Sequence, residues 1–177
     1  MNPYPPFTLW LTGLPASGKT TLAIGTHNRL AQLGVPSVLI DGDEFRRDFC
    51  SDLGFSLNDR RENIRRAASM ARMVNGSGVI AICSFVSPTR SIRELAASII
   101  GPNRYLEVFV DSPVALCMER DPKGLYLKAK AGIIREFTGI SSPYDIPHDP
   151  FCTIDTSELN IEQSTNELVM QIEEMIC

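Results

Sequence analysis

The segment GLPASGKT, residues 13–20, constrains the chain more than any other feature because it fits the pattern G-x-x-x-x-G-K-[ST]. The apolar run FTLWLT (residues 7–12) precedes it and predicts a buried strand, and a helical pattern over residues 19–33 follows it. A tight loop between a strand and a helix presents several backbone N–H donors at the positive end of that helix. This context predicts a phosphate-binding loop and disfavours a chance glycine turn.

The residues of this loop divide between phosphate contacts and a metal contact. Lys19 is placed to reach the β- and γ-phosphates of a nucleotide, and the Thr20 hydroxyl is placed to ligate Mg²⁺. Because the chain lacks the sequence N-K-x-D with which G proteins read guanine, adenine is favoured and ATP is the expected nucleotide. The expected ATP-binding residues are Gly13, Leu14, Pro15, Ala16, Ser17, Gly18, Lys19, Thr20 and Thr21.

Apolar runs alternate with helical patterns along the rest of the chain. Further strands are expected at residues 38–40, 79–86, 106–110 and 151–154, and further helices at 57–74, 91–100, 114–120 and 161–176. The strands are continuously apolar, which is typical of a parallel sheet covered on both faces. The prediction is an α/β fold of the P-loop kinase type, with a five-stranded parallel sheet and helices on both faces.

Helical spacing predicts which side chains face the core, and Ser56 with Asp59 predicts a capping box before the helix at 57–74. The expected inward residues are Leu22, Ala23, Leu30 and Leu33 in the first helix, Ile64, Ala67, Ala68, Ala71 and Val74 in the helix at 57–74, and Ile161, Leu168, Ile172 and Ile176 in the last.

Length and composition predict one domain over residues 1–177, because no repeat or linker divides the chain. Residues 121–150 are rich in Lys, Gly, Pro and Tyr with weak periodicity, and predict a mobile excursion.

The net charge of −4 argues against a nucleic-acid partner, and apolar runs far shorter than about 20 residues argue against a membrane span. The start lacks a signal peptide's basic region, and an odd number of widely spaced cysteines suits free thiols in the cytoplasm. The five cysteines are Cys50, Cys83, Cys117, Cys152 and Cys177.

An acidic pair, Asp41 and Asp43, follows the expected second strand, and Arg46 comes three residues later. Ligands bind at the carboxyl ends of strands in open α/β sheets. Asp41 can therefore hold the magnesium shell with Thr20, while Asp43 orients or deprotonates a substrate hydroxyl. The alternative is a polar turn with a helix cap at Asp43, since Asp-Gly is common in turns.

Several motifs together resemble the adenylylsulfate kinase family. They are DGDEFR (41–46), LGFSLNDRRENIRR (53–66), FVSP (85–88), RDPKGLY (120–126) and FTGISSPY (137–144), and with the phosphate loop they cover residues 13–155 in matching order. The resemblance implies an ATP- and Mg²⁺-dependent kinase of sulfate activation. Such an enzyme transfers the γ-phosphoryl group of ATP to the 3′-hydroxyl of adenosine 5′-phosphosulfate.

The resemblance carries acceptor-binding roles onto Arg46, Arg60 and Asn63, and it implies that Phe55 and Phe137 sandwich the acceptor adenine. Guanidinium groups suit the phosphosulfate oxyanion, and Phe55 precedes a helix whose matching staple position is Arg60 rather than an apolar residue. Without the resemblance, both phenylalanines would be interpreted as core residues. The neighbouring arginines are interpreted as solvated charges of the helix surface: Arg61, Arg65 and Arg66.

Further residues are carried over from the same family. Val86 and Ser87 lie on the acceptor side, and the Ser87 position is a catalytic candidate, although we expect it to bind near the acceptor ribose because in-line transfer needs no covalent stage. Arg120, just before the excursion, is expected to contact ATP, and Lys123 and Lys128 within it are expected to contact the acceptor, as parts of a closing lid. The resemblance also implies a homodimer.

Two other functions stay open at the level of sequence. One is a P-loop kinase for another small hydroxyl compound, such as a sugar acid or a nucleoside, in which Phe55 and Phe137 would be core residues. The other is a regulatory nucleotide-binding module without turnover, which would require a damaged catalytic set. Lys19, Thr20 and Asp43 are all present, which disfavours the second.

Overall fold

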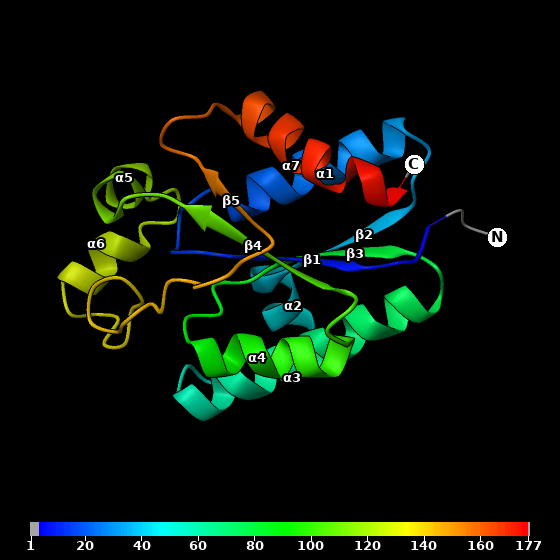
Figure 1. Cartoon of the computed structure of the whole chain (residues 1–177). Helices are drawn as coiled ribbons and strands as arrows, with labels where there is room; N and C mark the ends of the chain where they lie inside the picture. The colour runs from blue at the N-terminus through cyan, green and yellow to red at the C-terminus, as the bar shows by residue number, and fades with distance from the viewer. Residues whose placement is uncertain (1–3, 177) are drawn as a thin grey trace.

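Five parallel strands form one sheet in the order β2-β3-β1-β4-β5 in the computed structural model, which describes residues 4–176 (Figure 1). The strands are β1 (Thr8–Thr12), β2 (Ser37–Asp41), β3 (Ile80–Ser84), β4 (Tyr105–Asp111) and β5 (Cys152–Asp155). The expected five-stranded parallel sheet is confirmed.

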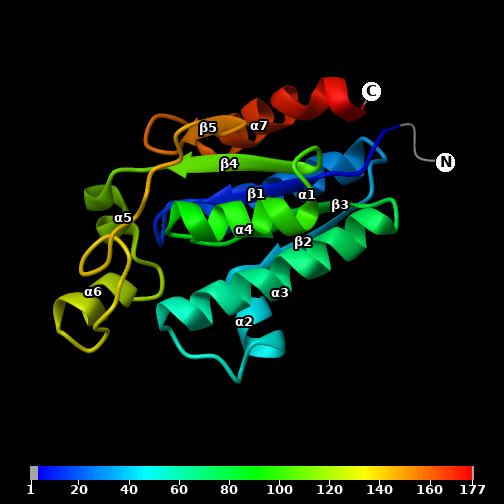
Figure 2. The same cartoon turned by 60° about the horizontal axis from the view of Figure 1, so that its bottom comes forward.

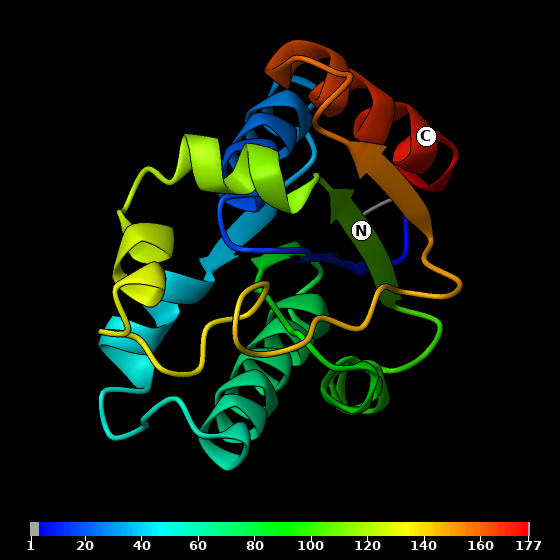
Figure 3. The same cartoon turned by 90° about the vertical axis from the view of Figure 1, so that its left-hand side faces the viewer.

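Helices cover both faces of this sheet. One face carries α1 (Lys19–Gln32) and α7 (Ile161–Ile176), and the other carries α2 (Gly42–Phe49), α3 (Leu57–Gly76) and α4 (Arg90–Ile100) (Figures 1 and 2). The short helices α5 (Val114–Arg120) and α6 (Leu125–Lys130) lie beyond the carboxyl ends of the strands. Figure 3 looks at this end, where the segments that follow the strands meet.

The core has two layers because the central strands are buried on both sides. On β1, Leu9 and Leu11 pack toward α1 and α7, whereas Trp10 packs toward α3 and α4. A strand that must be apolar on both faces cannot show alternating polarity, which explains the continuous apolar runs of the sequence. The capping box of α3 is also present, with Ser56 and Asp59 exchanging their hydrogen bonds.

Some inward positions were predicted wrongly. Leu33 is 43% exposed because α1 ends at Gln32 and Leu33 caps it, and Ile161 is 65% exposed in the first turn of α7. The strand at 38–40 is not fully buried, since β2 forms an edge of the sheet and leaves Val38 exposed. The other core positions of α1 and α7, together with Ile64 and the three alanines of α3, are buried, and Val74 is half-buried.

Two helices had no sequence prediction. Helix α2 follows β2 directly, and its cap is Asp41 rather than Asp43: the Asp41 carboxylate accepts from the backbone N–H groups of Asp43 and Glu44. Helix α6 lies inside the excursion at residues 121–150, where Tyr126 and Phe137 are buried in a small apolar cluster with Cys117. Because Cys117 of α5 and Leu14 of the phosphate loop belong to or border this cluster, the excursion is packed against both.

The remaining structural predictions concern cysteines and membrane spans. Cys50, Cys83, Cys117 and Cys152 are free thiols, and Cys177 lies outside the described residues. Within residues 4–176, every helix is too short or too polar to cross a bilayer.

Candidate active site

The phosphate loop joins β1 to α1 through backbone conformations that few residues adopt. Ala16 and Gly18 have φ values of 61° and 100°, and Gly18 is the N-cap of α1. At Gly13 a Cβ would lie 2.5 Å from the carbonyl oxygen of Val110, so only glycine fits beside β4. These conformations curl the loop over the N-terminus of α1, where backbone N–H groups bind oxyanions.

Lys19 is buried beneath this loop, with 8% of its surface exposed. Its Nζ donates to the carbonyl oxygens of Gly13 at 3.0 Å and Leu14 at 2.6 Å, and lies 3.4 Å from Ser17 Oγ. Burial lowers the pKa of Lys19 to about 8, although the nearby Asp43 and Asp41 carboxylates oppose this shift. An incoming phosphate would offer the ammonium group a better acceptor than two neutral carbonyls.

Thr20 and Asp41, the two expected metal ligands, are in direct contact. The Thr20 hydroxyl donates to Asp41 Oδ2 at 2.8 Å, and Ser84 Oγ at the end of β3 lies 3.4 Å from Thr20 Oγ1. These oxygens line a small cavity of about 140 Å³ together with Glu44. Hydroxyl and carboxylate oxygens are the donors that Mg²⁺ prefers, so the residues fit this ion. Residues 4–176 contain no cluster of three or more His, Cys, Asp or Glu side chains suited to a metal.

Asp43 projects from the first turn of α2 and is largely exposed, and the Lys123 ammonium pairs with its carboxylate. This ion pair raises the pKa of Lys123 above its ordinary value, chiefly through the hydrogen bond to Asp43. The pair joins the segment before α6 to the carboxyl end of β2, over 80 residues of sequence. The predicted general base and a predicted lid cation are therefore brought together.

A second contact joins the loop to the segment after β5. The Thr156 hydroxyl lies 2.8 Å from the carbonyl oxygen of Ser17, and Arg120 donates to Thr156 Oγ1 at 3.1 Å and to its carbonyl oxygen at 2.6 Å. Arg120, which the sequence predicts to contact ATP, is thus linked to the phosphate loop through Thr156. Thr21, in contrast, is exposed on the first turn of α1.

The predicted acceptor residues gather at the segment between α2 and α3. Arg46 Nη1 donates to the carbonyl oxygen of Gly54 at 2.7 Å, and its guanidinium carbon lies 4.7 Å from the ring centroid of Phe55. Arg60 donates to the carbonyl oxygens of Phe55 at 3.0 Å and Glu136 at 2.9 Å. Arg60 therefore bridges the two segments that carry Phe55 and Phe137.

The two phenylalanines differ in burial. Phe55 is 64% exposed, whereas Phe137 is 7% exposed and packs edge-on against Tyr126, with ring centroids 4.9 Å apart. Asn63, on the same face of α3 as Arg60, is buried, and its Oδ1 has no hydrogen-bond partner among the described residues. Lys128 is exposed on α6.

Ser87 lies inside the protein. Ser87 is 2% exposed and has a φ of 43°. Its Oγ accepts a hydrogen bond from Trp10 Nε1 at 3.0 Å, and its carbonyl oxygen accepts one from Arg93 Nη1 at 3.0 Å. The preceding Val86 carbonyl accepts from the Thr12 hydroxyl. Because the Ser87 hydroxyl is engaged by Trp10, its clearest role in this structure is to hold the turn after β3.

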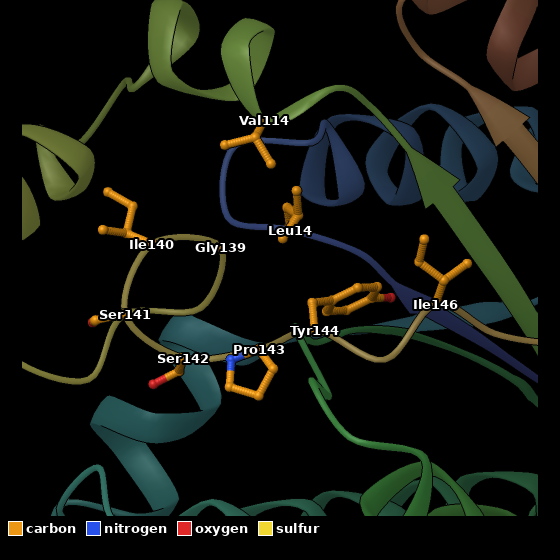
Figure 4. Close-up of a pocket in the computed structure, with 9 residues that line it drawn as sticks. All are labelled: Leu14, Val114, Gly139, Ile140, Ser141, Ser142, Pro143, Tyr144 and Ile146. Atoms are coloured by element: carbon orange, nitrogen blue, oxygen red, sulfur yellow. The ribbon is translucent and has the colours of Figure 1, made fainter.

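A cavity of about 430 Å³ lies between the phosphate loop and residues 139–146 (Figure 4). Leu14 and Val114 border it on one side and Tyr144 on the other. The Tyr144 hydroxyl lies 2.9 Å from Thr12 Oγ1, and its ring stacks on Phe109. Sequence reasoning assigned no role to Thr156, Tyr144 or Ser84; only Tyr144 lies in a quoted motif, FTGISSPY.

A family model described as adenylylsulphate kinase matches residues 5–155. The chain belongs to the adenylylsulfate kinase family. The match covers the phosphate loop, Asp41 and Asp43, and the residues around Phe55 and Phe137. Thr156, which contacts the loop, lies one residue beyond the match. It confirms the resemblance drawn from the motifs, and with it the class of enzyme, a kinase.

Relatives in sequence and structure agree with the adenylylsulfate kinase assignment. The adenylyl-sulfate kinase of Bacteroides thetaiotaomicron is 46% identical over 164 residues, covering 93% of this chain and 82% of the relative. That of Escherichia coli is 46% identical over 168 residues, covering 95% and 81%. The Mycobacterium tuberculosis APS kinase CysC, solved in complex with AMPPNP and APS, superposes with a TM-score of 0.92 at 37% identity, covering 97% of this chain and 99% of that chain.

Proposed function

We propose that this chain transfers the γ-phosphoryl group of ATP to the 3′-hydroxyl of adenosine 5′-phosphosulfate, giving 3′-phosphoadenosine 5′-phosphosulfate and ADP. The observation that carries the proposal is the position of α2 between the two halves of the site. Its cap, Asp41, contacts Thr20 of the phosphate loop, and its Arg46 contacts the segment that carries Phe55. A donor at the loop and an acceptor at Phe55 would therefore meet at Asp43.

The donor half uses the loop and its lysine. Backbone N–H groups of the phosphate loop, in which Pro15 supplies none, bind the phosphates of ATP together with the Lys19 ammonium. Arg120 lies against the segment that borders the loop. Thr20 and Asp41 would hold Mg²⁺, which, when bound, neutralises charge on the transferred phosphoryl group.

The acceptor half uses charge and ring stacking. Arg46 and Arg60 bind the phosphosulfate, and the exposed ring of Phe55 stacks on the acceptor adenine, with Asn63 and Phe137 completing this subsite. The hydroxyl oxygen attacks the γ-phosphorus as the bond to ADP breaks, and Asp43 takes the hydroxyl proton. Lys123 and Lys128, on the segment proposed as the lid (121–150), bring positive charge to the reacting groups, and Lys123 already pairs with Asp43.

The proposal also covers the domain organisation, the location and the assembly of the protein. Residues 1–177 form one domain, which acts in the cytoplasm as a homodimer, and the family resemblance supports the dimer. A hexameric APS kinase from Thiobacillus denitrificans superposes on this chain with a TM-score of 0.73 at 28% identity, although the match covers 29% of that chain. Light scattering of the purified protein would decide between these assemblies.

Acceptor identity is tested by ADP release coupled to a reporter enzyme, with adenosine 5′-phosphosulfate, nucleosides and gluconate as competing acceptors, each with and without Mg²⁺. Turnover with the sulfated nucleotide alone, dependent on Mg²⁺, is expected. Equal turnover with gluconate or a nucleoside would contradict the proposed acceptor, and no turnover with any acceptor would favour a regulatory module.

The role of Asp43 is tested by Asp43→Asn, with Asp48→Asn as the matched control on the same helix. Asp48 is exposed and pairs only with Arg47 among the described residues. Asp43→Asn should lower kcat by about 10²- to 10⁴-fold, the usual contribution of a general base, while ATP still binds. Normal turnover of Asp43→Asn would show that another group takes the proton.

A further inference from the structure

Residues 50–56 form the segment that joins α2 to α3 and carries Phe55, and three arginines contact it: two through its backbone carbonyls and one through the side chain of Asp52. Arg46 donates to the Gly54 carbonyl, and Arg60 donates to the Phe55 carbonyl. Both already have a place in the acceptor site. The third is Arg66, two turns further along α3, which the sequence predicts as a solvated surface charge.

Arg66 contacts both the end of α2 and the segment that follows it. Its Nη1 and Nη2 donate to the two carboxylate oxygens of Asp52, each at 2.7 Å, in a bidentate pair. Nη1 also donates to the carbonyl oxygen of Phe49 at 3.0 Å, at the end of α2. The Arg66 side chain is 30% exposed, so the prediction of a solvated charge was wrong for this residue.

Glu62 orients this guanidinium from the opposite side. Its Oε1 accepts from Arg66 Nε at 2.9 Å, one helical turn earlier on α3. Hydrogen bonds from Arg65 and Arg66 lower the pKa of Glu62 to about 2, so its carboxylate is charged throughout the neutral range. With two carboxylates beside it, the Arg66 charge is neutralised, and Arg66 is unsuited to binding the acceptor anion itself.

The ring of Phe55 depends on this backbone because little else fixes it. It is 64% exposed, and its ring contact among the described residues is the Arg46 guanidinium. Adjacent Gly54 has no side chain to pack, and Asp59 of the capping box lies close to it. Within residues 50–53, Cys50 is buried and Leu53 packs against the core, so the Arg66–Asp52 pair acts together with this packing. A displacement of residues 51–53 would reach Phe55 through the backbone.

We propose that Arg66 is a positioning residue for the acceptor: its bidentate pair with Asp52 holds residues 50–56 so that Phe55 presents its ring to the acceptor base. This inference rests on the proposed function for the identity of the acceptor. It predicts that loss of the pair weakens acceptor binding and leaves the donor half and the proton transfer unchanged, because the hydrogen bonds of Arg66 within the described part of the chain are to Glu62, Phe49 and Asp52, which belong to neither.

The test compares Arg66→Lys with Arg65→Lys. Lysine keeps the charge at position 66 but cannot form the bidentate pair. Arg65 is the matched control, because it lies on the same helix and, among residues 4–176, its side chain pairs with Glu62 and with no residue of 50–56. Arg66→Lys should raise the KM for adenosine 5′-phosphosulfate about five- to tenfold, as expected for a lost charge-assisted pair, with kcat and the KM for ATP within about twofold of the wild type. Arg65→Lys should change none of them.

Asp52→Asn supplies the second side of a double-mutant cycle. If Arg66 acts through Asp52, the Arg66→Lys/Asp52→Asn double variant should raise the acceptor KM no further than Arg66→Lys alone. Fully multiplicative effects of the two substitutions would overturn the proposal, as would an unchanged acceptor KM in Arg66→Lys. A parallel loss of kcat and of ATP affinity would instead show a general structural role and would also overturn it.

Amide hydrogen exchange separates this inference from the proposed function. Exchange within residues 50–56 should become faster in Arg66→Lys and stay unchanged in Arg65→Lys, whichever acceptor the enzyme uses. If the wild type phosphorylates a different acceptor, the proposed function fails, and the same KM comparison is made with that acceptor. Unchanged exchange in Arg66→Lys would overturn the positioning role even if adenosine 5′-phosphosulfate is the substrate.

Discussion

Lys19 shows how one residue couples burial to phosphate binding. Its ammonium group lies under the phosphate loop and donates to two backbone carbonyls, and burial lowers its pKa to about 8. A bound triphosphate supplies negative charge at the same place and favours the protonated amine. Where the Lys19 amine of the free protein is deprotonated, binding of ATP should therefore be accompanied by uptake of a proton.

The sign of this effect fixes its pH range. Below about pH 8 the amine of the free protein is already charged, and above that pH it is neutral and must be protonated on binding. The Kd for ATP should therefore rise about tenfold between pH 7 and pH 9. Calorimetry in buffers of different ionisation enthalpy should show uptake of about half a proton at pH 8 and little at pH 7. Uptake that stays at zero between pH 7 and pH 9 would show that Lys19 remains charged.

Ser87 is the second residue whose structure leads to a prediction. Because its hydroxyl accepts from Trp10 Nε1 inside the protein, Ser87→Ala should cost about 1 kcal/mol of stability, the usual loss for one hydrogen bond. Turnover should fall by no more than about threefold, since in-line transfer needs no serine intermediate. Denaturant titration and steady-state kinetics measure the two effects. A large loss of kcat with unchanged stability would restore Ser87 as a catalytic residue.

At the scale of elements, α6 connects the excursion to the phosphate loop. The Tyr126 hydroxyl donates to the carbonyl oxygen of Pro15 at 3.0 Å, and the Tyr126 ring is 1% exposed against Phe137. Leu14 packs against the same apolar cluster. The middle of the loop, where Pro15 replaces a backbone donor with a ring, is thus braced by a helix over 100 residues away in the sequence.

Tyr126→Phe removes this hydrogen bond while keeping the ring. The Pro15 carbonyl loses its donor, so the loop should become less rigid and the KM for ATP should rise about two- to fivefold, consistent with a net hydrogen-bond contribution of about 0.5–1 kcal/mol. The KM for the acceptor should change less, and steady-state kinetics with each substrate varied in turn would measure both. Tyr105→Phe is a suitable control, because its hydroxyl donates to Glu107, away from the loop. An unchanged ATP KM in Tyr126→Phe would mean that the loop holds its shape without α6.

The elements that the sequence predicted are those with a continuous apolar signal. The runs at 79–86 and 106–110 became β3 and β4, because central strands must be apolar on both faces. Helix α2 was missed because its eight residues are mostly charged and only Phe45 is buried. Its signal was electrostatic: Asp41 caps it, acidic residues occupy its first turn, and Arg46 and Arg47 occupy its last.

At the scale of the whole molecule, predictability depended on sequence separation. The phosphate loop is contiguous, so its pattern could be read directly, and the Asp41–Thr20 pair followed from the rule that strand ends meet at one edge. Contacts such as Thr156 with Ser17, and Tyr144 with Thr12, are 139 and 132 residues apart. No local periodicity marks such partners, because their proximity arises only when β5 and the excursion close over the loop. Arg66 was misjudged for a different reason: Asp52 is only 14 residues away but lies outside helix α3, so helical spacing gives no sign of the pair.

The sheet also determines how the molecule should unfold. Trp10, the one tryptophan of the sequence, is fully buried on β1 and stacks on Phe85 with ring centroids 5.1 Å apart. Leu9 and Leu11, on either side of Trp10 in the same strand, belong to the opposite core layer. Neither layer can therefore unfold without disrupting the strand that both share. Unfolding should therefore be cooperative across both layers.

This cooperativity is measured by urea titration at equilibrium, followed by Trp10 fluorescence and by far-UV circular dichroism. The two midpoints should coincide within experimental error, because the fluorescence reports one core layer and the dichroism reports all the helices. Cleavage by a protease within residues 121–150 should begin at urea concentrations well below this midpoint. The reason is that the apolar cluster of α6 is small and separate from both core layers. If the fluorescence transition came at clearly lower urea than the dichroism, the α3–α4 layer would unfold independently, and the chain would not behave as one cooperative domain.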